Sequence, residues 1–505
     1  TGILQQASKT DYSAYGIPKQ NPHVLKGVAG SPYAISDYYS VSADLADDPA
    51  KRMEEFDQLV ERTHKAGLKM IIDFVPNHVA RNYKSATAPE GIKDFGENDD
   101  TNKAFDPNNN FYYIPGRKFE PNLDLGQGDD RYEEYPAKAT GNDCFHACPS
   151  VNDWYETVKL NYGVDYCGGG HYHFDPIPDT WSKMLNILLY WCKKGVDGFR
   201  CDMVFMVPVD FWHWAIAQVK KKYPRVIFIA EIYDPAIYRS YIHYGGFDYL
   251  YDKVGLYDTL RAIIECRESA SAITRRWQEI DDIHENMVNF LENHDEQRIA
   301  SDFFAGDARK ALPALVVSAL MRNNPFMCYF GQELGEKGMD EEGFSGRDGR
   351  TTIFDYWGVK SLQKLQGKDD SWRRHGLQVY ERELWDYYAK VFEIAKEDAV
   401  VRGSFYDLQY ANMENPNYNP HRNYAFFRSF GRELLLVIVN FDAEDKEIGL
   451  NVPQEAWEFV GFTSRKRHIE NLLTGAWDYL EIDIKKQLTY KVPGYGAVAL
   501  RIQGK

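Results

Sequence analysis

Four polar segments that follow apolar runs carry residues with the chemistry of an active site. They are DFVPNH (73–78), GFRCD (198–202), AEIYD (230–234) and ENHD (292–295). If each apolar run is a strand of one parallel sheet, the four polar ends meet at the same mouth of that sheet. Strand side chains alternate with a period of two, so Arg200 and Asp202 face the same side. Glu231 ends the next strand, and His294 and Asp295 end a later one, which predicts a ring of carboxylates.

A pair of carboxylates at such a mouth suits the cleavage of glycosidic bonds. One must be ionised to attack the anomeric carbon, and Arg200 would hold Asp202 ionised and oriented. The other must keep a proton for the leaving oxygen. Glu231 follows the apolar run Val226 to Ala230, where desolvation would raise its pKa. The alternative is that these charges form ion pairs that only stabilise the strand ends. Four such ends in one ring favour catalysis.

The elements that must position these segments repeat one plan: an amphipathic helix, a Gly or Pro stop, and a short apolar strand. Strands are predicted at 68–74, 196–202, 226–231, 247–251, 287–292 and 326–330. Helices alternating with this many strands favour a closed (β/α)8 TIM barrel over an open sheet. Only six good strands are found, with Thr1 to Leu4 as the possible tail of one more. We therefore expect that about 50–80 residues of amino-terminal barrel units are missing.

Two regions interrupt the repeating plan and set the predicted domains. About a hundred residues from Val79 to Pro178 separate two barrel strands, too many for a plain loop in a compact domain. Beyond a helix at Val379 to Lys396, the pattern changes to short alternating strands with turn signals, which predicts an antiparallel β-sandwich. Its predicted strands include 423–430, 433–441, 447–452, 480–484 and 488–502. The predicted domains are a partial barrel start (1–78), an inserted irregular domain (79–178), the continued barrel (179–398) and a C-terminal β-sandwich (399–505).

Composition excludes several kinds of partner. The chain has 505 residues, with 59 basic and 75 acidic side chains and a net charge of −16. A surface this acidic would repel a phosphate backbone, so nucleic acid is not expected. The longest apolar stretches, such as Leu434 to Val439, fall far short of the ~20 residues of a membrane span. Thr1 is not an initiator methionine and no targeting segment follows it, so the compartment stays open.

One group of cysteines and histidines could be drawn as a zinc site. Its members are Cys144, His146, Cys148, Cys167, His171 and His173. Their separations are irregular, and Gly168 to Gly170 make the second half flexible, whereas zinc ligands usually have regular spacing. We therefore expect no zinc site here.

The four segments, in this order and spacing, resemble those of the α-amylase superfamily, glycoside hydrolase family 13. SPYAISDYYSV (31–41) and YFGQE (329–333) are similar to two further segments of that family, and the likeness covers nearly the whole chain. It implies an α-amylase-like glycosidase that works by retaining double displacement through a covalent glycosyl-enzyme. The implied substrates are starch-like glucans or maltooligosaccharides, cleaved at their α-glucosidic bonds, chiefly the α-1,4 bonds. No organic cofactor is expected.

The same resemblance implies roles for seven residues. Asp202 matches the nucleophile, Glu231 matches the general acid/base, and Asp295 matches the third carboxylate, which binds sugar hydroxyls. Arg200 matches the arginine beside the nucleophile. His78 and His294 match the histidines that bond the sugar at the cleavage point, and Tyr33 matches the tyrosine that stacks beneath that sugar. Two simpler readings stay open. Asn77 and His78 could cap the loop after their strand, and Tyr33 could be a packing residue. Asp73 resembles a structural aspartate rather than a catalytic one.

Departures from the family pattern concern calcium, which many α-amylases hold between the barrel and the inserted domain. Asn77 matches one calcium ligand, but Lys159 occupies the position of an aspartate ligand and Met206 that of a histidine. Calcium needs several oxygen ligands, so an ammonium in place of a carboxylate should abolish the site. We expect the Lys159 ammonium to sit where the metal would and to bridge the two domains.

Three alternatives to an α-amylase remain at this point. The family lysine three residues after the nucleophile is Phe205 here, which leaves specificity on the leaving-group side open. The chain could therefore be an α-glucan transglycosylase or an exo-acting α-glucosidase. Some chains of this architecture are non-catalytic sugar-binding or partner subunits, but such chains typically lack the carboxylate triad that is present here.

Overall fold

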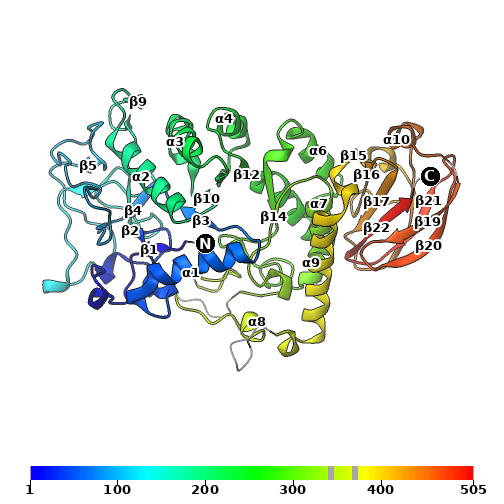
Figure 1. The fold of residues 1–505 in the computed structure, drawn as a ribbon, viewed down its shortest axis with the longest axis horizontal. Coiled ribbons are helices and arrows are strands. Elements are labelled where there is room, and N and C mark those ends of the chain that lie inside the picture. The colour runs from blue at the N-terminus through cyan, green and yellow to red at the C-terminus, as the bar shows by residue number, and fades with distance from the viewer. Residues whose placement is uncertain (1, 339–345, 367–372, 464, 504–505) are drawn as a thin grey trace. The chain divides into compact units, whose positions relative to one another are not determined.

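The computed structural model describes residues 2–338, 346–366, 373–463 and 465–503, and the chain divides into two compact units. Unit 1 comprises Thr1–Leu250 and Ile353–Tyr356. Unit 2 comprises Tyr251–Glu342, Gly346–Thr352 and Trp357–Lys505. The ribbon in Figure 1 follows the chain from its blue amino-terminal part to its red carboxyl-terminal part.

Unit 1 contains the parallel strands that the apolar runs predict. These are β3 (Ile71–Phe74), β10 (Gly198–Cys201), β11 (Ile227–Ala230) and β12 (Tyr249–Tyr251), whose last residue falls in unit 2. Strand β10 lies between β3 and β11, with Arg200 opposite Asp73 on one side and Ile229 on the other. Asp202 and Glu231 come directly after the last residues of β10 and β11, outside the ladder. Their side chains are therefore free to form a site at this edge of the sheet.

Amphipathic helices accompany these strands, as the periodicity predicts. They are α1 (Arg52–Lys65), α2 (Asp179–Lys193), α3 (Val209–Lys222) and the short α4 (Tyr238–His243). Gly67 and Gly195 follow α1 and α2 with φ of 74° and 93°, so the predicted glycine stops are confirmed. The buried Trp191 of α2 packs edge-on against Phe56 of α1 at 5.3 Å between ring centroids. Its indole N–H donates to the Tyr38 carbonyl at 2.8 Å.

The amino-terminal end differs from the prediction. Leu4 does not end a parallel barrel strand but begins β1 (Leu4–Gln6), which pairs antiparallel with β2 (Ile35–Val41). Thr1 lies outside the described residues. Strand β2 is buried along its whole length, and its run of seven residues reads as a strand only once its partner is known.

Short two-stranded ribbons hold the segment between β3 and α2. The ribbons pair β4 (His78–Ala80) with β7 (Thr157–Lys159), β5 (Tyr113–Ile114) with β6 (Ala137–Lys138), and β8 (Val164–Asp165) with β9 (His171–Tyr172). In the first ribbon His78 stands opposite Lys159. This pairing anchors the return of the long insertion beside the polar end of β3.

Unit 2 continues the parallel pattern. Strands β13 (Met287–Phe290) and β14 (Phe326–Met327) are parallel, and the N–H of Asp252, just after β12, donates to the Val288 carbonyl of β13. The helices of unit 2 are α5 (Asp258–Ile264), α6 (Ala272–Glu279), α7 (Leu312–Leu320), α8 (Lys360–Gln363), α9 (Val379–Glu397) and α10 (Gln454–Phe459). Every residue of α7 after Leu312 is buried, and α9 packs beside it (Figure 1).

The carboxyl-terminal part of unit 2 is antiparallel, as predicted. Its six-stranded sheet has the order β15-β16-β17-β22-β19-β20, and β18 pairs with β21. The strands are β15 (Ser404–Asp407), β16 (Asn423–Phe430), β17 (Glu433–Asn440), β18 (Lys446–Leu450), β19 (Arg465–Asn471), β20 (Ala476–Ile482), β21 (Leu488–Val492) and β22 (Gly496–Gln503). One face of the sheet, including Val437, packs with α7 and α9, and the other, including Ile438, packs with β18 and β21.

Two details of this sheet correct the sequence prediction. The run from Leu488 to Ile502, expected as one strand, is broken into β21 and β22 by a turn in which Tyr495 has φ of 46°. Strand β19 was not expected, because its charged sequence RKRHIEN lacks an apolar alternation.

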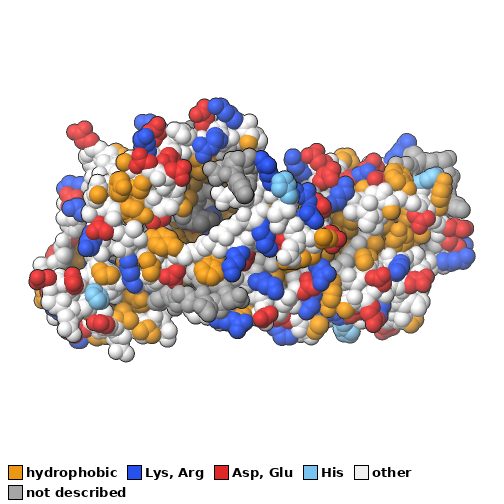
Figure 2. Space-filling view, turned by 90° about the horizontal axis from the view of Figure 1, so that it is seen from below, with side chains coloured by type: hydrophobic (Ala, Val, Ile, Leu, Met, Phe, Trp, Pro, Cys, Tyr) orange, Lys and Arg blue, Asp and Glu red, His pale blue; other side chains and the backbone are white. Residues whose placement is uncertain are grey.

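Charged side chains of both signs are interspersed on the face of the molecule that Figure 2 shows. Among the described residues, no helix combines the length and the apolar composition needed to cross a membrane.

A buried arginine, Arg428 of β16, ties the C-terminal sheet to the loops beneath it. Its guanidinium donates to the carbonyls of Met321, Val401 and Gly403 and to the side chain of Asn323. A buried acceptor that loses its donor retains the desolvation cost without compensation.

We predict that Arg428→Met lowers the free energy of unfolding by about 3 kcal/mol or more, because several buried carbonyl groups lose their donor together. Urea unfolding would measure the change. Arg432→Met, at the exposed turn between β16 and β17, is the matched control and should change stability little. Equal stabilities of the two variants would contradict the role given to Arg428.

Candidate active site

Unit 1 brings five of the predicted site residues into one contiguous cluster. They are Tyr33, His78, Arg200, Asp202 and Glu231, and each of the last three is at most 5% exposed. Arg200 is the next-to-last residue of β10 and Asp202 comes directly after the strand, while Glu231 follows β11. Parallel pairing of β10 with β11 in register places these residues at the same edge, as the strand ends predict.

Arg200 is the centre of this cluster. One of its terminal nitrogens lies 3.0 Å from Oδ1 of Asp202 and 3.5 Å from Oδ2 of Asp73. The other lies 2.8 Å from Oε1 of Glu231. One buried guanidinium therefore contacts three buried carboxylates, and its planar fork fixes the position of two of them relative to each other.

Glu231 accepts hydrogen bonds on both of its carboxyl oxygens. Oε2 accepts from the backbone N–H of Met203 at 2.9 Å, and Oε1 accepts from the hydroxyl of Tyr233 at 2.6 Å. Met203 has φ of 46° and ψ of 46°, a left-handed conformation that costs a residue with a side chain about 1–3 kcal/mol. This conformation directs the N–H that follows Asp202 toward Glu231.

The two carboxyl groups interact directly. Burial raises the pKa of Asp202 well above its usual range, the nearby Glu231 carboxylate raises it further, and Arg200 opposes both. Arg200 alone does not keep Asp202 acidic, which differs from the sequence expectation, because the site is buried and holds a second carboxylate. The titrations of Asp202 and Glu231 are therefore linked, since a charge on one carboxyl group disfavours a charge on the other.

Tyr33 and His78 complete the cluster in unit 1. The hydroxyl of Tyr33 donates to Asp73 at 2.9 Å, and the Arg200 guanidinium lies 5.6 Å from the centre of the tyrosine ring. The His78 ring hydrogen bonds to the backbone of Tyr33 and packs 5.2 Å from the ring of Trp154. Burial, together with the charges of the nearby Lys159 and Lys26, lowers the pKa of His78 to about 3. The imidazole is thus neutral near pH 7 and can donate one hydrogen bond and accept another.

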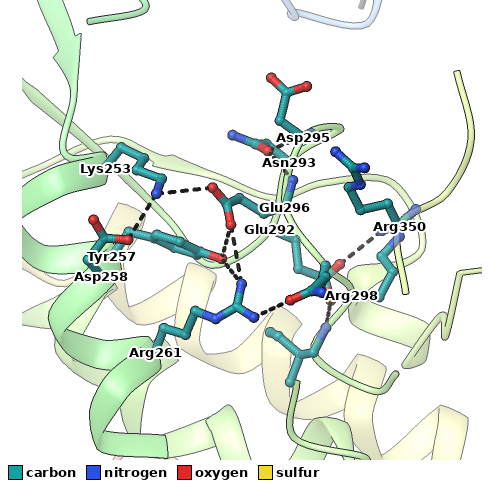
Figure 3. Close-up of polar contacts among 12 residues, drawn as sticks. Lys253, Tyr257, Asp258, Arg261, Glu292, Asn293, Asp295, Glu296, Arg298 and Arg350 are labelled. Atoms are coloured by element: carbon teal, nitrogen blue, oxygen red, sulfur yellow. Dashed lines mark hydrogen bonds and ion pairs between the residues drawn. The ribbon is translucent and has the colours of Figure 1, made fainter. Parts of the chain in front are cut away.

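His294 and Asp295 belong to unit 2, where they form a pair at 3.1 Å. The side chain of Asp295 is 48% exposed and points away from the polar contacts beneath it (Figure 3). Oδ1 of Asn293 accepts the N–H groups of both Asp295 and Glu296 at 2.9 Å, which fixes the turn. The loop therefore presents Asp295 on a rigid base.

Ion pairs beneath this turn explain its rigidity. Arg298 contacts Glu292 at 2.9 Å, and the second oxygen of Glu292 accepts the N–H of Ile299 at 2.6 Å. Glu296 accepts from Tyr257 at 2.9 Å and pairs with Arg261 at 3.2 Å (Figure 3). Sequence inspection gave these residues no role, since their partners come from helices some forty residues earlier or from later loops.

Lys159 contacts Asn77 and Met206, two positions that the family resemblance associates with calcium ligands. The buried Lys159 ammonium donates to Oδ1 of Asn77 at 2.5 Å and to the carbonyl of Met206 at 3.1 Å. It also pairs with Asp143 at 2.7 Å. Burial lowers the pKa of Lys159 and the Asp143 carboxylate opposes this shift. A cation thus links oxygen atoms from the loop after β3, the loop after β10 and the long insertion.

Three residues of this site escaped the sequence analysis. Tyr233 stood inside the quoted segment AEIYD, yet its contact with Glu231 depends on the loop conformation after β11. Met203 contributes only its backbone, which no residue type signals. Asp143 comes from an irregular segment whose path cannot be predicted from local pattern.

Comparison with known proteins relates this chain to alpha-amylases. The model of the alpha-amylase catalytic domain matches residues 20–122 and 177–378, which together make up more than half of the chain. Alpha-amylase 3 of Dictyoglomus thermophilum is 23% identical over 390 residues, covering 74% of this chain and 68% of that protein. An alpha-1,4-glucan:maltose-1-phosphate maltosyltransferase of Picrophilus torridus is 43% identical over 216 residues, covering 41% of this chain and 24% of that protein.

A solved structure shares the fold. The maltogenic alpha-amylase AmyB of Thermotoga neapolitana aligns with a TM-score of 0.62 and 19% identity, covering all of this chain and 89% of that one. The predicted fold class, a (β/α)8 barrel with an inserted segment and a C-terminal antiparallel domain, is confirmed by this likeness and by the parallel strands.

The low pKa of His78 gives a test of its burial. Below about pH 6.5 the unfolded chain binds a proton at His78, and the folded chain does not until about pH 3. Folding stability must therefore fall as the pH falls through this window. In His78→Gln the slope of unfolding free energy against pH between 4 and 6 should be shallower by up to about 1.4 kcal/mol per pH unit.

Urea unfolding at several pH values would measure this slope. His171→Gln, a change at an exposed histidine, is the control. An unchanged slope in His78→Gln would show that the imidazole is accessible to protons in the folded protein.

Proposed function

The chain belongs to the alpha-amylase family of glycoside hydrolases, and we propose that it cleaves α-glucosidic bonds, chiefly α-1,4, in starch-like glucans or maltooligosaccharides. The observation that carries this proposal is the contact of one buried guanidinium, Arg200, with both Asp202 and Glu231. Such a pair holds one proton and one negative charge, which are the two requirements of a retaining glycosidase.

The proposed reaction begins with Asp202 as nucleophile. The Asp202 carboxylate attacks the anomeric carbon while Glu231 gives its proton to the glycosidic oxygen, which leaves with the bonding electrons as a sugar hydroxyl. This step forms an ester between Asp202 and the sugar. Glu231, now ionised, takes a proton from a water molecule, and the resulting hydroxide attacks the same carbon and releases Asp202.

The contacts of Glu231 suit a carboxylate: the Met203 N–H and the Tyr233 hydroxyl donate to it, and the Arg200 guanidinium lies 2.8 Å away. Burial and the neighbouring Glu231 raise the pKa of Asp202 well above its usual range. The proposed first step needs the proton on Glu231, so we propose that bound substrate shifts the proton of this pair from Asp202 to Glu231.

The remaining site residues are proposed to bind the sugar at the cleavage point. Tyr33 offers a ring beside Arg200, and the neutral imidazole of His78 would bond a sugar hydroxyl in place of its present contact with the Tyr33 backbone. Asp295, exposed on its rigid turn beside His294, can accept hydrogen bonds from two vicinal hydroxyl groups. The proposed substrate is neutral, so the net negative charge of the chain neither attracts nor repels it.

Transfer of the glycosyl unit to a second sugar is the alternative proposal. Phe205 is 37% exposed on the loop after β10, and a ring at this position offers an apolar surface to a sugar acceptor. The similar maltosyltransferase of Picrophilus torridus is named for such a transfer. Water and sugar compete for the same ester, so both reactions can use the same carboxylates.

We also propose that the protein needs no calcium at the position that many relatives use. The contacts of Lys159 support this proposal. Asn77, Met206 and Asp143 direct oxygen atoms at its ammonium group, which takes the place that a metal would need. The positive charge of Lys159 links these loops as a calcium ion would.

Product analysis on a maltooligosaccharide ladder tests the proposed hydrolysis. The parent protein should release shorter sugars, and Asp202→Asn should lower the rate by at least about 10³-fold because it removes the nucleophile. Longer sugars formed beside the shorter ones would favour the transfer alternative. If both proteins leave the ladder unchanged, α-1,4-glucan hydrolysis is excluded.

Thermal unfolding with and without a chelator tests the replacement of calcium by Lys159. We expect EDTA to leave the Tm unchanged and Lys159→Met to lower stability by about 2–4 kcal/mol, since Asn77 and Met206 lose their donor. Lys51→Met, at an exposed lysine, is the control. Lys159→Asp should create calcium dependence, seen as a Tm that rises with added Ca²⁺. A large drop of the parent Tm in EDTA would contradict the proposal.

A further inference from the structure

The residue two positions after Glu231 makes the shortest contact to this carboxyl group. The hydroxyl of Tyr233 lies 2.6 Å from Oε1, closer than the Arg200 nitrogen at 2.8 Å and the Met203 N–H at 2.9 Å. The charged groups that face Glu231 are Arg200 and Asp202. The contact thus belongs to the buried cluster and not to the surface of the loop.

The ring of Tyr233 is held by an independent contact. It packs against Phe205 in an edge-on arrangement, with 6.3 Å between ring centroids and 60° between ring planes. Phe205 comes from the loop after β10, whereas Tyr233 follows β11. The hydroxyl is therefore aimed at Glu231 by packing between two adjacent loops.

A hydroxyl differs from the other two partners of Glu231 in one respect. The guanidinium of Arg200 and the N–H of Met203 can only donate, so they match only an ionised carboxylate. A tyrosine hydroxyl can donate to a carboxylate and can equally accept from a protonated carboxyl group. It is the partner of Glu231 that fits both protonation states.

We propose that Tyr233 is a positioning residue for Glu231, one that keeps a hydrogen bond to the carboxyl group as it alternates between acid and base. The proposal rests on the proposed function, because only a double displacement requires Glu231 to lose a proton in one step and regain it in the next. In the first step the Glu231 proton moves to the leaving oxygen, and the Tyr233 hydroxyl turns from acceptor to donor. In the second step the proton taken from water reverses that turn.

Tyr233→Phe tests this role, because it removes the hydroxyl and keeps the ring against Phe205. We expect kcat on a maltooligosaccharide to fall about tenfold, the loss of one hydrogen bond to a charged group, with KM within about twofold of the parent. The hydrogen bond that the hydroxyl donates to ionised Glu231 is stronger than the one it accepts from the protonated form, so its loss should move the alkaline limb of the kcat/KM profile to higher pH.

The leaving group supplies a second readout that a structural role would not move. A 4-nitrophenyl maltooligosaccharide needs little protonation on departure, so the kcat/KM deficit of Tyr233→Phe should be smaller on this substrate than on the natural sugar. Tyr244→Phe is the matched control, since its hydroxyl also donates to a carboxylate, Asp210 at 2.9 Å, on the exposed surface. It should match the parent in both assays.

The outcomes separate the two proposals. If the parent cleaves the sugar and Tyr233→Phe shows the parent's kcat and pH profile, the positioning role is wrong while the proposed function stands. If Tyr233→Phe loses activity equally on both substrates with no shift of the alkaline limb, the tyrosine acts only through structure and the proposal is again overturned. A parent that cleaves neither substrate would overturn the proposed function itself.

Discussion

Burying carboxylates is costly, and the candidate site depends on the way Arg200 offsets that cost. Each ion taken from water loses several kcal/mol of solvation, which only close opposite charge and well-formed hydrogen bonds can return. Arg200 contacts Asp73, Asp202 and Glu231 at once, so the cluster holds more negative charge than one guanidinium can neutralise. Burial and this excess of negative charge raise the pKa of Asp202, which favours a proton on the pair. A site that needs one mobile proton is thus a direct result of its charge balance.

The scaffold serves this cluster by fixing its backbone. In-register pairing of β3, β10 and β11 sets Asp73, Arg200 and Ile229 side by side, so the polar residues just beyond each strand start from fixed positions. The strained Met203 aims a backbone N–H at Glu231, a form of local strain that occurs where the surroundings determine the conformation. Lys159 fixes the neighbouring loops by charge, and the turn that carries Asp295 is fixed by its own ion pairs. In both places side-chain charges and hydrogen bonds fix loop backbone that is not paired in a β-sheet.

Much of this arrangement could be predicted because it follows from periodicity. Apolar runs of strand length that end in polar residues identify β3, β10, β11 and β13, and the period of two puts Arg200 and Asp202 on one side. The family resemblance likewise singled out Asn77 as a match to the calcium-ligand pattern and Lys159 as a departure from it. Features that depend on backbone conformation or on distant partners could not be predicted. The left-handed Met203, the turn of Tyr233 toward Glu231 and the antiparallel pairing of β1 with β2 have no local signature, and the polar strand β19 contradicts the usual one.

We propose that Asp202 carries the glycosyl unit as an ester, and that Arg200, in contact with both Asp202 and Glu231, positions the two carboxyl groups. A fluorinated glucosyl fluoride, which forms the ester quickly and hydrolyses slowly, tests this claim directly. After incubation with the parent protein, digestion and mass spectrometry should find one glycosyl unit on the peptide that contains Asp202, and none in Asp202→Asn. Label on a different carboxylate, or turnover of natural substrate without any trapped ester, would contradict the account.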